Sequence, residues 1–187
     1  MSGMRAGAAP RYALIQRALH WLIALMAVGV LGLGLTLDAY GFDGLNAAFG
    51  IEITNMVFKY HKTLGVLILA AMAARIAARL AFGAPPYAAP LTRFERAASR
   101  LTHGLLYLGL VAMPVLGWSA TAASGFPVEF FNWRLPGLIG VDKPLGAALY
   151  TIHGAVAWGL IALILLHVAA ATMHGVVKRD GVLSRML

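Results

Sequence analysis

Residues 144–174 read PLGAALYTIHGAVAWGLIALILLHVAAATMH, an apolar run long enough to cross a bilayer that nevertheless carries His153, His167 and His174. Spacings of fourteen and seven residues, at about 100° per residue, place the three imidazoles within roughly 60° on one helix face. His153 and His167 would lie about 21 Å apart along the axis, one towards each side of the hydrocarbon layer. Ionisable groups at such depth are costly and indicate a functional site.

Composition places the whole chain in a membrane. Of its 187 residues, 60% are hydrophobic and 12% are charged, and the mean hydropathy is +0.79, whereas a soluble domain has about 25% charged residues. The absence of cysteine excludes disulfides, thiolate metal sites, iron–sulfur clusters and covalently attached haem. Because no acidic residue lies in the strongly apolar runs, histidine is the ligand type that remains inside the membrane.

The chain is expected to be all-α, an integral membrane four-helix bundle that forms one domain over residues 1–187. The predicted helices cover residues 12–37, 55–82, 91–123 and 144–174, with a kink at Pro114, an acidic loop at 38–55 and an aromatic interfacial cap at 124–143. The net charge of +8 fits the positive-inside rule better than nucleic-acid binding. Basic residues concentrate in the segments that would share a side with the ends of the chain, so both termini are expected in the cytoplasm.

In this topology four histidines sort into two pairs by depth. His20 and His167 lie towards the cytoplasmic side, and His61 and His153 towards the periplasmic side. A single buried histidine is often a satisfied polar residue in a helix interface, but two pairs at two depths favour metal ligation. Two histidines from facing helices make a six-coordinate haem that carries electrons and has no open position for a small ligand. The pattern predicts two non-covalent haem b groups in a transmembrane electron path.

Three further residues each have alternative roles. Arg75 follows His61 by fourteen residues on the same helix face, so it either snorkels to the headgroups or contacts a haem propionate or quinone. His103 is either an interfacial hydrogen-bonding residue or a cofactor contact. His174 is a candidate contact for a quinone or a propionate.

Four stretches resemble the bacterial cytochrome b561 family: RALHWL at 17–22, KYHKTLGV at 59–66, LYLGLVAMPVLGW at 106–118, and IHGAVAWGLIALILLHVAAATMHGVVKRDGVLSRML at 152–187. The resemblance implies a four-helix, di-haem b protein of the bacterial inner membrane, with His20 and His167 on one haem and His61 and His153 on the other. Relatives often have an acidic residue and a second histidine where this chain has Gly154 and Gly175.

The family's best-defined member oxidises superoxide, which implies superoxide as electron donor and ubiquinone as acceptor. The cationic residues Lys59, Lys62, Arg134 and Lys143 fall on the periplasmic side, where they either steer the anion or are ordinary interface residues. The alternative is a haem-bearing membrane anchor that passes electrons between quinone and a separate periplasmic dehydrogenase or hydrogenase subunit. A third hypothesis is a transporter that uses the histidines as a proton relay.

Overall fold

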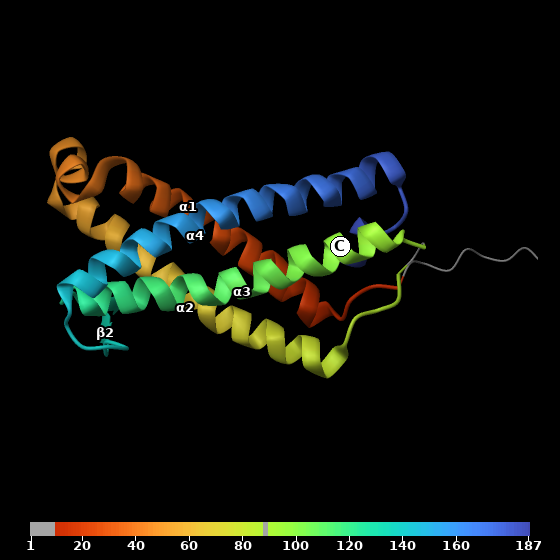
Figure 1. Ribbon diagram of the computed structural model, residues 1–187, viewed down its shortest axis with the longest axis horizontal. Helices are drawn as coiled ribbons and strands as arrows, with labels where there is room; N and C mark the ends of the chain where they lie inside the picture. Colours follow the sequence, from red (N-terminus) through yellow and green to blue (C-terminus); the bar gives the residue numbers. More distant parts are fainter. Residues whose placement is uncertain (1–9, 88–89) are drawn as a thin grey trace, which may run out of the picture.

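Four long helices dominate the computed structural model, which describes residues 10–87 and 90–187 (Figure 1). They are α1 (Leu14–Phe49), α2 (Ile51–Phe82), α3 (Arg93–Ala123) and α4 (Lys143–Thr172). Each is long and apolar enough to cross a membrane. Large apolar side chains such as Leu25, Leu80 and Leu108 are exposed on their outer faces. The predicted four helices are confirmed, and their surface suits contact with lipid.

The helices pack in the order α1 on α2, α2 on α3 and α3 on α4. The buried centre comprises Ile23 from α1 with Ile68, Ala71 and Met72 from α2. Helix α3 runs without a break through Pro114. Small residues allow close helix contact, because a Cβ at Gly109 of α3 would lie 2.5 Å from a methyl group of Leu160 in α4.

The two ends of the bundle differ in what they carry (Figure 1). The chain enters and leaves at one end, where the Tyr12 N–H donates to the Arg185 carbonyl at 3.1 Å. We call this the terminal end. The opposite end carries the connection from α1 to α2 and a two-stranded hairpin, and we call it the hairpin end. The first described residues and the last residues of the chain therefore lie at the same end of the bundle.

The expected loop at residues 38–55 is wrong. Helix α1 continues to Phe49, with one non-helical residue, Gly41 (φ 63°), at a kink, and α2 begins at Ile51 directly after Gly50 (φ 81°). Both glycines have positive φ, a conformation that other residues adopt only with strain. The apolar side chain of Leu45, 1% exposed, packs the short helical segment after the kink into the bundle. Gly41 therefore bends the helix here without replacing it by a loop.

The aromatic segment expected as a cap contains an antiparallel hairpin. Strands β1 (Val128–Phe130) and β2 (Trp133–Leu135) pair with Val128 opposite Leu135. The Phe131 N–H donates to the hydroxyl of the buried Thr63 at 3.1 Å, which holds the hairpin on α2. Within residues 10–87 and 90–187, these two short strands are the only regular structure that is not helical.

After α4 the chain forms a π-helical turn and then folds back across the terminal end of the bundle. A π-helical turn, η1 (Met173–Lys178), follows Thr172, and a short 3-10 turn, η2 (Leu183–Arg185), ends the chain. The Trp21 indole N–H of α1 donates to the Met186 carbonyl at 2.8 Å. Helical structure therefore passes the predicted end at residue 174, and the tail closes the terminal end of the bundle.

Candidate functional site

Two histidines face one another at the hairpin end. The ring centroids of His61 in α2 and His153 in α4 are 6.1 Å apart, with the ring planes at 75°. The Nδ1 atoms of both rings are buried and have no hydrogen-bond partner among residues 10–87 and 90–187. Buried polar atoms without a partner are rare. The pair therefore has unused hydrogen-bonding or ligating capacity within the bundle.

A glycine stands behind each of these two rings. A Cβ built at Gly34 of α1 would lie 3.1 Å from His61 Cε1, and one built at Gly117 of α3 would lie 3.0 Å from His153 Cε1. The backbone carbonyls of Val30 and Met113 lie beside the same two rings. The absence of a side chain on each glycine lets the imidazole approach the neighbouring helix backbone, and this contact fixes the ring from behind.

A second pair with the same separation lies nearer the terminal end. The centroids of His20 in α1 and His167 in α4 are also 6.1 Å apart, with the planes at 79°. His103 of α3 lies closer to His167, at 5.1 Å, and its Nδ1 lies 2.6 Å from the carbonyl of Ser99 one turn earlier. The structure thus brings together both predicted pairs and places His103 against one of them, with one ring nitrogen already hydrogen-bonded.

The helices that carry each pair are not the ones that pack most closely. His20 and His167 join α1 to α4, and His61 and His153 join α2 to α4, whereas close packing unites α1 with α2 and α3 with α4. Helix α4 buries only Gly146 and Leu160 of its residues. His153 and His167 on this helix are half-buried.

Comparison with known proteins identifies the family. The family model described as prokaryotic cytochrome b561 matches residues 11–187. The chain is 31% identical to cytochrome b561 homolog 2 of Escherichia coli K12, over 95% of this chain and 91% of that protein. It is 24% identical to the probable superoxide oxidase CybB of Yersinia pestis, over 95% of this chain and 96% of that protein. The chain belongs to the prokaryotic cytochrome b561 family. It is a multi-pass bacterial membrane protein of electron transfer, and its family implies haem b.

The histidine pairs fit such a group. With metal–imidazole bonds of about 2.0 Å, an ion held between two imidazole nitrogens sets the ring centroids about 6 Å apart. The ring centroids of both histidine pairs have this separation. The centroids of His103 and His167 are only 5.1 Å apart, which is too short for an ion between the two rings. Within residues 10–87 and 90–187 no group of three or more histidine, aspartate or glutamate residues could hold a metal. A haem iron already has four porphyrin nitrogens as ligands, so two histidines are enough to complete its coordination. A free metal ion would need more protein ligands than two.

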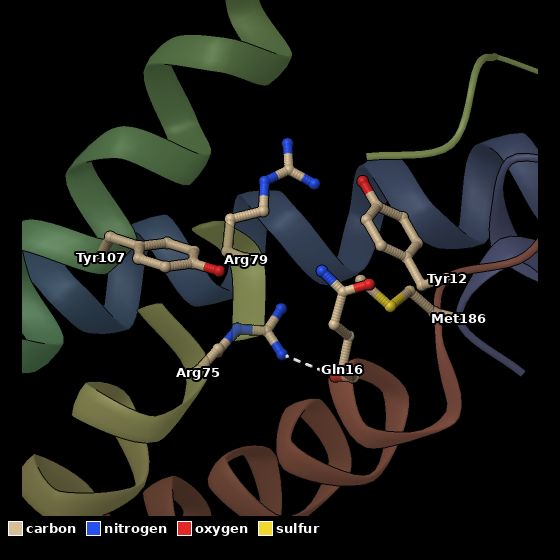
Figure 2. A pocket seen from close by; sticks show the side chains of 6 residues that line it. All are labelled: Tyr12, Gln16, Arg75, Arg79, Tyr107 and Met186. Atoms are coloured by element: carbon tan, nitrogen blue, oxygen red, sulfur yellow. Dashed lines mark hydrogen bonds between the residues drawn. The ribbon is translucent and has the colours of Figure 1, made fainter. Parts of the chain in front are cut away.

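Arg75 lies beside the pair at the terminal end. It is close enough to His20 and His167 for their charges to interact, and it contributes to a cavity of about 80 Å³ (Figure 2). One guanidinium nitrogen of Arg75 donates to the Gln16 carbonyl at 3.0 Å. The cavity is lined by Tyr12, Gln16, Arg75, Arg79, Tyr107 and Met186. In the described part of the chain no carboxylate pairs with either arginine, so the cavity is positively charged.

His174 has a carboxylate partner that sequence reasoning missed. Its Nδ1 lies 2.5 Å from an oxygen of Asp180, and both side chains are mostly shielded from solvent. Burial acts to raise the pKa of the Asp180 carboxyl, but hydrogen bonds from His174 and the Val182 N–H outweigh burial and hold this pKa below its ordinary value. The pair joins the π-helical turn to the tail.

The basic residues expected at the periplasmic side gather at the hairpin end, as do His61 and His153. Lys62 forms an ion pair of 2.6 Å with Glu129 of β1, and Lys59 donates to the Asn132 side chain at 2.8 Å. Arg134 stands opposite Glu129 in the hairpin register. Lys59, Lys62 and Arg134 therefore lie on or beside the hairpin with one carboxylate, Glu129, and we call these three residues the cationic cluster.

Several residues that contact the predicted site residues could not be predicted from a single sequence. Gly117 is one of many glycines in apolar helices, and only the fold shows that it backs His153. The contact of Glu129 with Lys62 can be recognised only once the hairpin is known, and that of Asp180 with His174 only once the chain is seen to fold back after α4. Gln16, which donates to the carbonyl of Gly83 at 3.0 Å, could have been noted as a polar residue inside the first apolar helix, where an amide needs a partner.

Proposed function

We propose that the protein holds two haem b groups, one on each histidine pair. His61 and His153 would be the axial ligands at the hairpin end, and His20 and His167 those at the terminal end. The observation that carries the proposal is the shared 6.1 Å centroid separation of both pairs. When bound, the two groups would supply reversible one-electron transfer. One domain, residues 1–187, would contain the whole path.

The protein side chains define what kind of chemistry the sites allow. Two imidazoles at each site would hold the haem iron, and a group held in this way would supply electron transfer and not oxygen activation. The carbonyls of Val30 and Met113 are placed to accept the second ring N–H of His61 and His153 after a small adjustment. Such a hydrogen bond fixes the tautomer of a metal ligand and raises its basicity.

For the reaction we propose oxidation of superoxide and reduction of ubiquinone. Two superoxide ions lose one electron each and become two dioxygen molecules, and one ubiquinone takes up both electrons and two protons to form ubiquinol. The printed name of the Yersinia pestis relative and the cationic cluster at the hairpin end support this direction. Lys59, Lys62 and Arg134 would attract the anionic donor and raise its encounter rate.

At the terminal end the charged cavity would hold an anionic group. Arg75 and Arg79 extend from α2 towards the Tyr12–Gln16 segment (Figure 2), and two guanidinium groups without a carboxylate partner suit a haem propionate or a quinone oxygen. We assign Arg75 and His174 as contacts of this kind. His103 would pack against His167 and leave the iron ligands unchanged.

We also propose that the terminal end faces the cytoplasm and the hairpin end the periplasm of the bacterial inner membrane. Most basic residues lie at or near the terminal end, which follows the positive-inside rule. This orientation exposes the cationic cluster to superoxide formed outside the cytoplasm. Ubiquinone would then take its protons at the opposite side.

The test uses the purified protein, a superoxide-generating system and a short-chain ubiquinone. The expected result is quinone reduction above the uncatalysed background, abolished when superoxide dismutase is added. No reduction above background in a protein that carries haem would contradict the superoxide reaction. Co-purification of a periplasmic dehydrogenase or hydrogenase subunit with such an inactive protein would support the membrane-anchor alternative.

A further inference from the structure

The start of α3 carries a cluster of arginines that the proposed electron path does not use. Arg93, Arg96 and Arg100 line, with Tyr87, a hollow of about 350 Å³ at the terminal end. Their spacing of three and four residues puts the arginines within about 60° on one helix face. All three side chains are exposed. The hollow is therefore a concave, strongly basic surface at the end of a membrane-spanning helix.

No local carboxylate neutralises these arginines. Among residues 10–87 and 90–187, none of the ion pairs involves Arg93, Arg96 or Arg100. Glu95 is the acidic residue of the first turn of α3. Its carboxylate is already paired with Lys178 and accepts a 2.8 Å hydrogen bond from the Thr92 N–H. The charge of the cluster is left for an external anion.

An apolar stripe runs along α3 beside the arginines. Phe94, Leu101 and Leu108 repeat every seven residues and have exposed fractions of 81%, 64% and 66%. The seven-residue spacing keeps them on one face, about 60–100° from Arg93, about 80–120° from Arg100 and about 120–160° from Arg96 around the helix, so the apolar stripe flanks the cluster on the side of Arg93 and Arg100. A basic stripe beside an exposed apolar stripe matches a molecule with an anionic head and apolar chains.

Tyr87 forms a fixed wall of the hollow. Its ring lies 4.8 Å from the Arg185 guanidinium, and the Arg185 side chain is 5% exposed and also donates to the Pro85 carbonyl. The cationic Arg185 thus adds positive potential behind the aromatic wall. Pro85 and Tyr87 both contact the Arg185 side chain of the tail at this point.

We propose that Arg93, Arg96 and Arg100 bind the phosphodiester headgroup of an anionic phospholipid, with its acyl chains along Phe94, Leu101 and Leu108. Guanidinium groups bind phosphate oxygens with paired, charge-assisted hydrogen bonds. Basic pockets at the ends of membrane helices are suited to such headgroups. A zwitterionic lipid fits less well, because its ammonium group would lie among the arginines.

The test is native mass spectrometry of the detergent-purified protein mixed with phosphatidylglycerol or phosphatidylcholine of identical acyl chains. The wild type should retain phosphatidylglycerol preferentially. The variant Arg96→Gln/Arg100→Gln should bind it about 30-fold more weakly, from about fivefold for each basic side chain near an anionic headgroup. The matched control Lys59→Gln/Arg134→Gln removes two charges at the hairpin end and should bind phosphatidylglycerol like the wild type.

Two further arms make the result decisive. Millimolar inorganic phosphate should displace little bound lipid, because it lacks the apolar chains; full displacement would overturn the assignment to a lipid. Equal retention of both lipids, or equal loss in both double variants, would overturn the site itself. Far-UV circular dichroism verifies the fold, and Arg96→Lys/Arg100→Lys, which keeps the charge, should recover most of the binding.

Discussion

The imidazoles of His61 and His153 face one another from α2 and α4 with centroids 6.1 Å apart, and each ring rests on a glycine of a third or fourth helix. All four helices therefore take part in one site: α2 and α4 supply the rings, and α1 and α3 supply Gly34 and Gly117 behind them. The position of each ring depends on the absence of a side chain on a neighbouring helix.

A side chain at Gly117 should disturb this site selectively. Because a Cβ there would lie 3.0 Å from His153 Cε1, Gly117→Val should displace the ring and reduce haem content by about half. The remaining haem should be the one on His20 and His167. Haem per chain, measured from the pyridine haemochrome, checks the result. Gly159→Ala is the matched control, because a Cβ at Gly159 meets nothing within 4 Å; an equal loss in both variants would count against a specific contact.

The cationic cluster at the hairpin end should govern the encounter with superoxide. The variant Lys59→Gln/Arg134→Gln should lower the rate of superoxide-driven quinone reduction by about 3- to 10-fold at low ionic strength, because steering by fixed charge raises association rates. The difference should shrink as salt is added. Arg96→Gln/Arg100→Gln, which removes two charges at the other end, should react with superoxide as the wild type does. A salt-independent defect would show that steering is not the cause.

Loss of Arg75 should change the potential of the nearer haem. Removing a fixed positive charge close to His20 and His167 favours the oxidised state, so Arg75→Gln should lower the midpoint potential of one haem by about 50 mV. Spectroscopic redox titration measures this shift. Arg79→Gln, one turn further along α2 and more exposed, should cause a smaller shift. Unchanged potentials in Arg75→Gln would remove this residue from the site.

The tail contact of Asp180 should depend on pH. The pKa of this carboxyl is held below its ordinary value of 3.8, so the ionised form stabilises the folded protein above that pH. The contribution is lost as the pH falls through the lowered pKa. Asp180→Asn should therefore cost about 0.5–1 kcal/mol of stability at neutral pH. Thermal unfolding in detergent should show a lower midpoint for the variant at pH 7, and this difference should shrink as the pH falls below 3.8 and the carboxyl of the folded protein becomes protonated.

The sequence was sufficient to pair the histidines, because helix periodicity and distance from the helix ends give both face and depth. It left open whether His103 is an interfacial hydrogen-bonding residue or a cofactor contact. The fold adds that its ring lies 5.1 Å from that of His167 and that its Nδ1 contacts the carbonyl of Ser99. Helix registers between neighbours are set by side-chain packing, which a single sequence does not display.

The regions outside the apolar runs were predicted less well. Asp38, Gly41 and Asp43 are residue types typical of a loop, and they led to the prediction of one. The apolar Leu45, which anchors the helix after the kink, was a weaker signal for a helix in this segment. The hairpin was read as an aromatic cap, because its strands have only three residues each, too few for a clear alternating pattern. Glu129 and its ion pair with Lys62 depend on that hairpin and were missed for the same reason.

The central claim is that each histidine pair holds one haem b, and the most direct measurement is the ratio of haem to protein in the purified chain. We predict two haems per chain for the wild type, about half of that content for His153→Ala, and unchanged content for His103→Ala. Reduced absorption spectra of the same samples should show b-type bands. A wild-type ratio of one, or a His153→Ala variant with undiminished haem, would contradict the account.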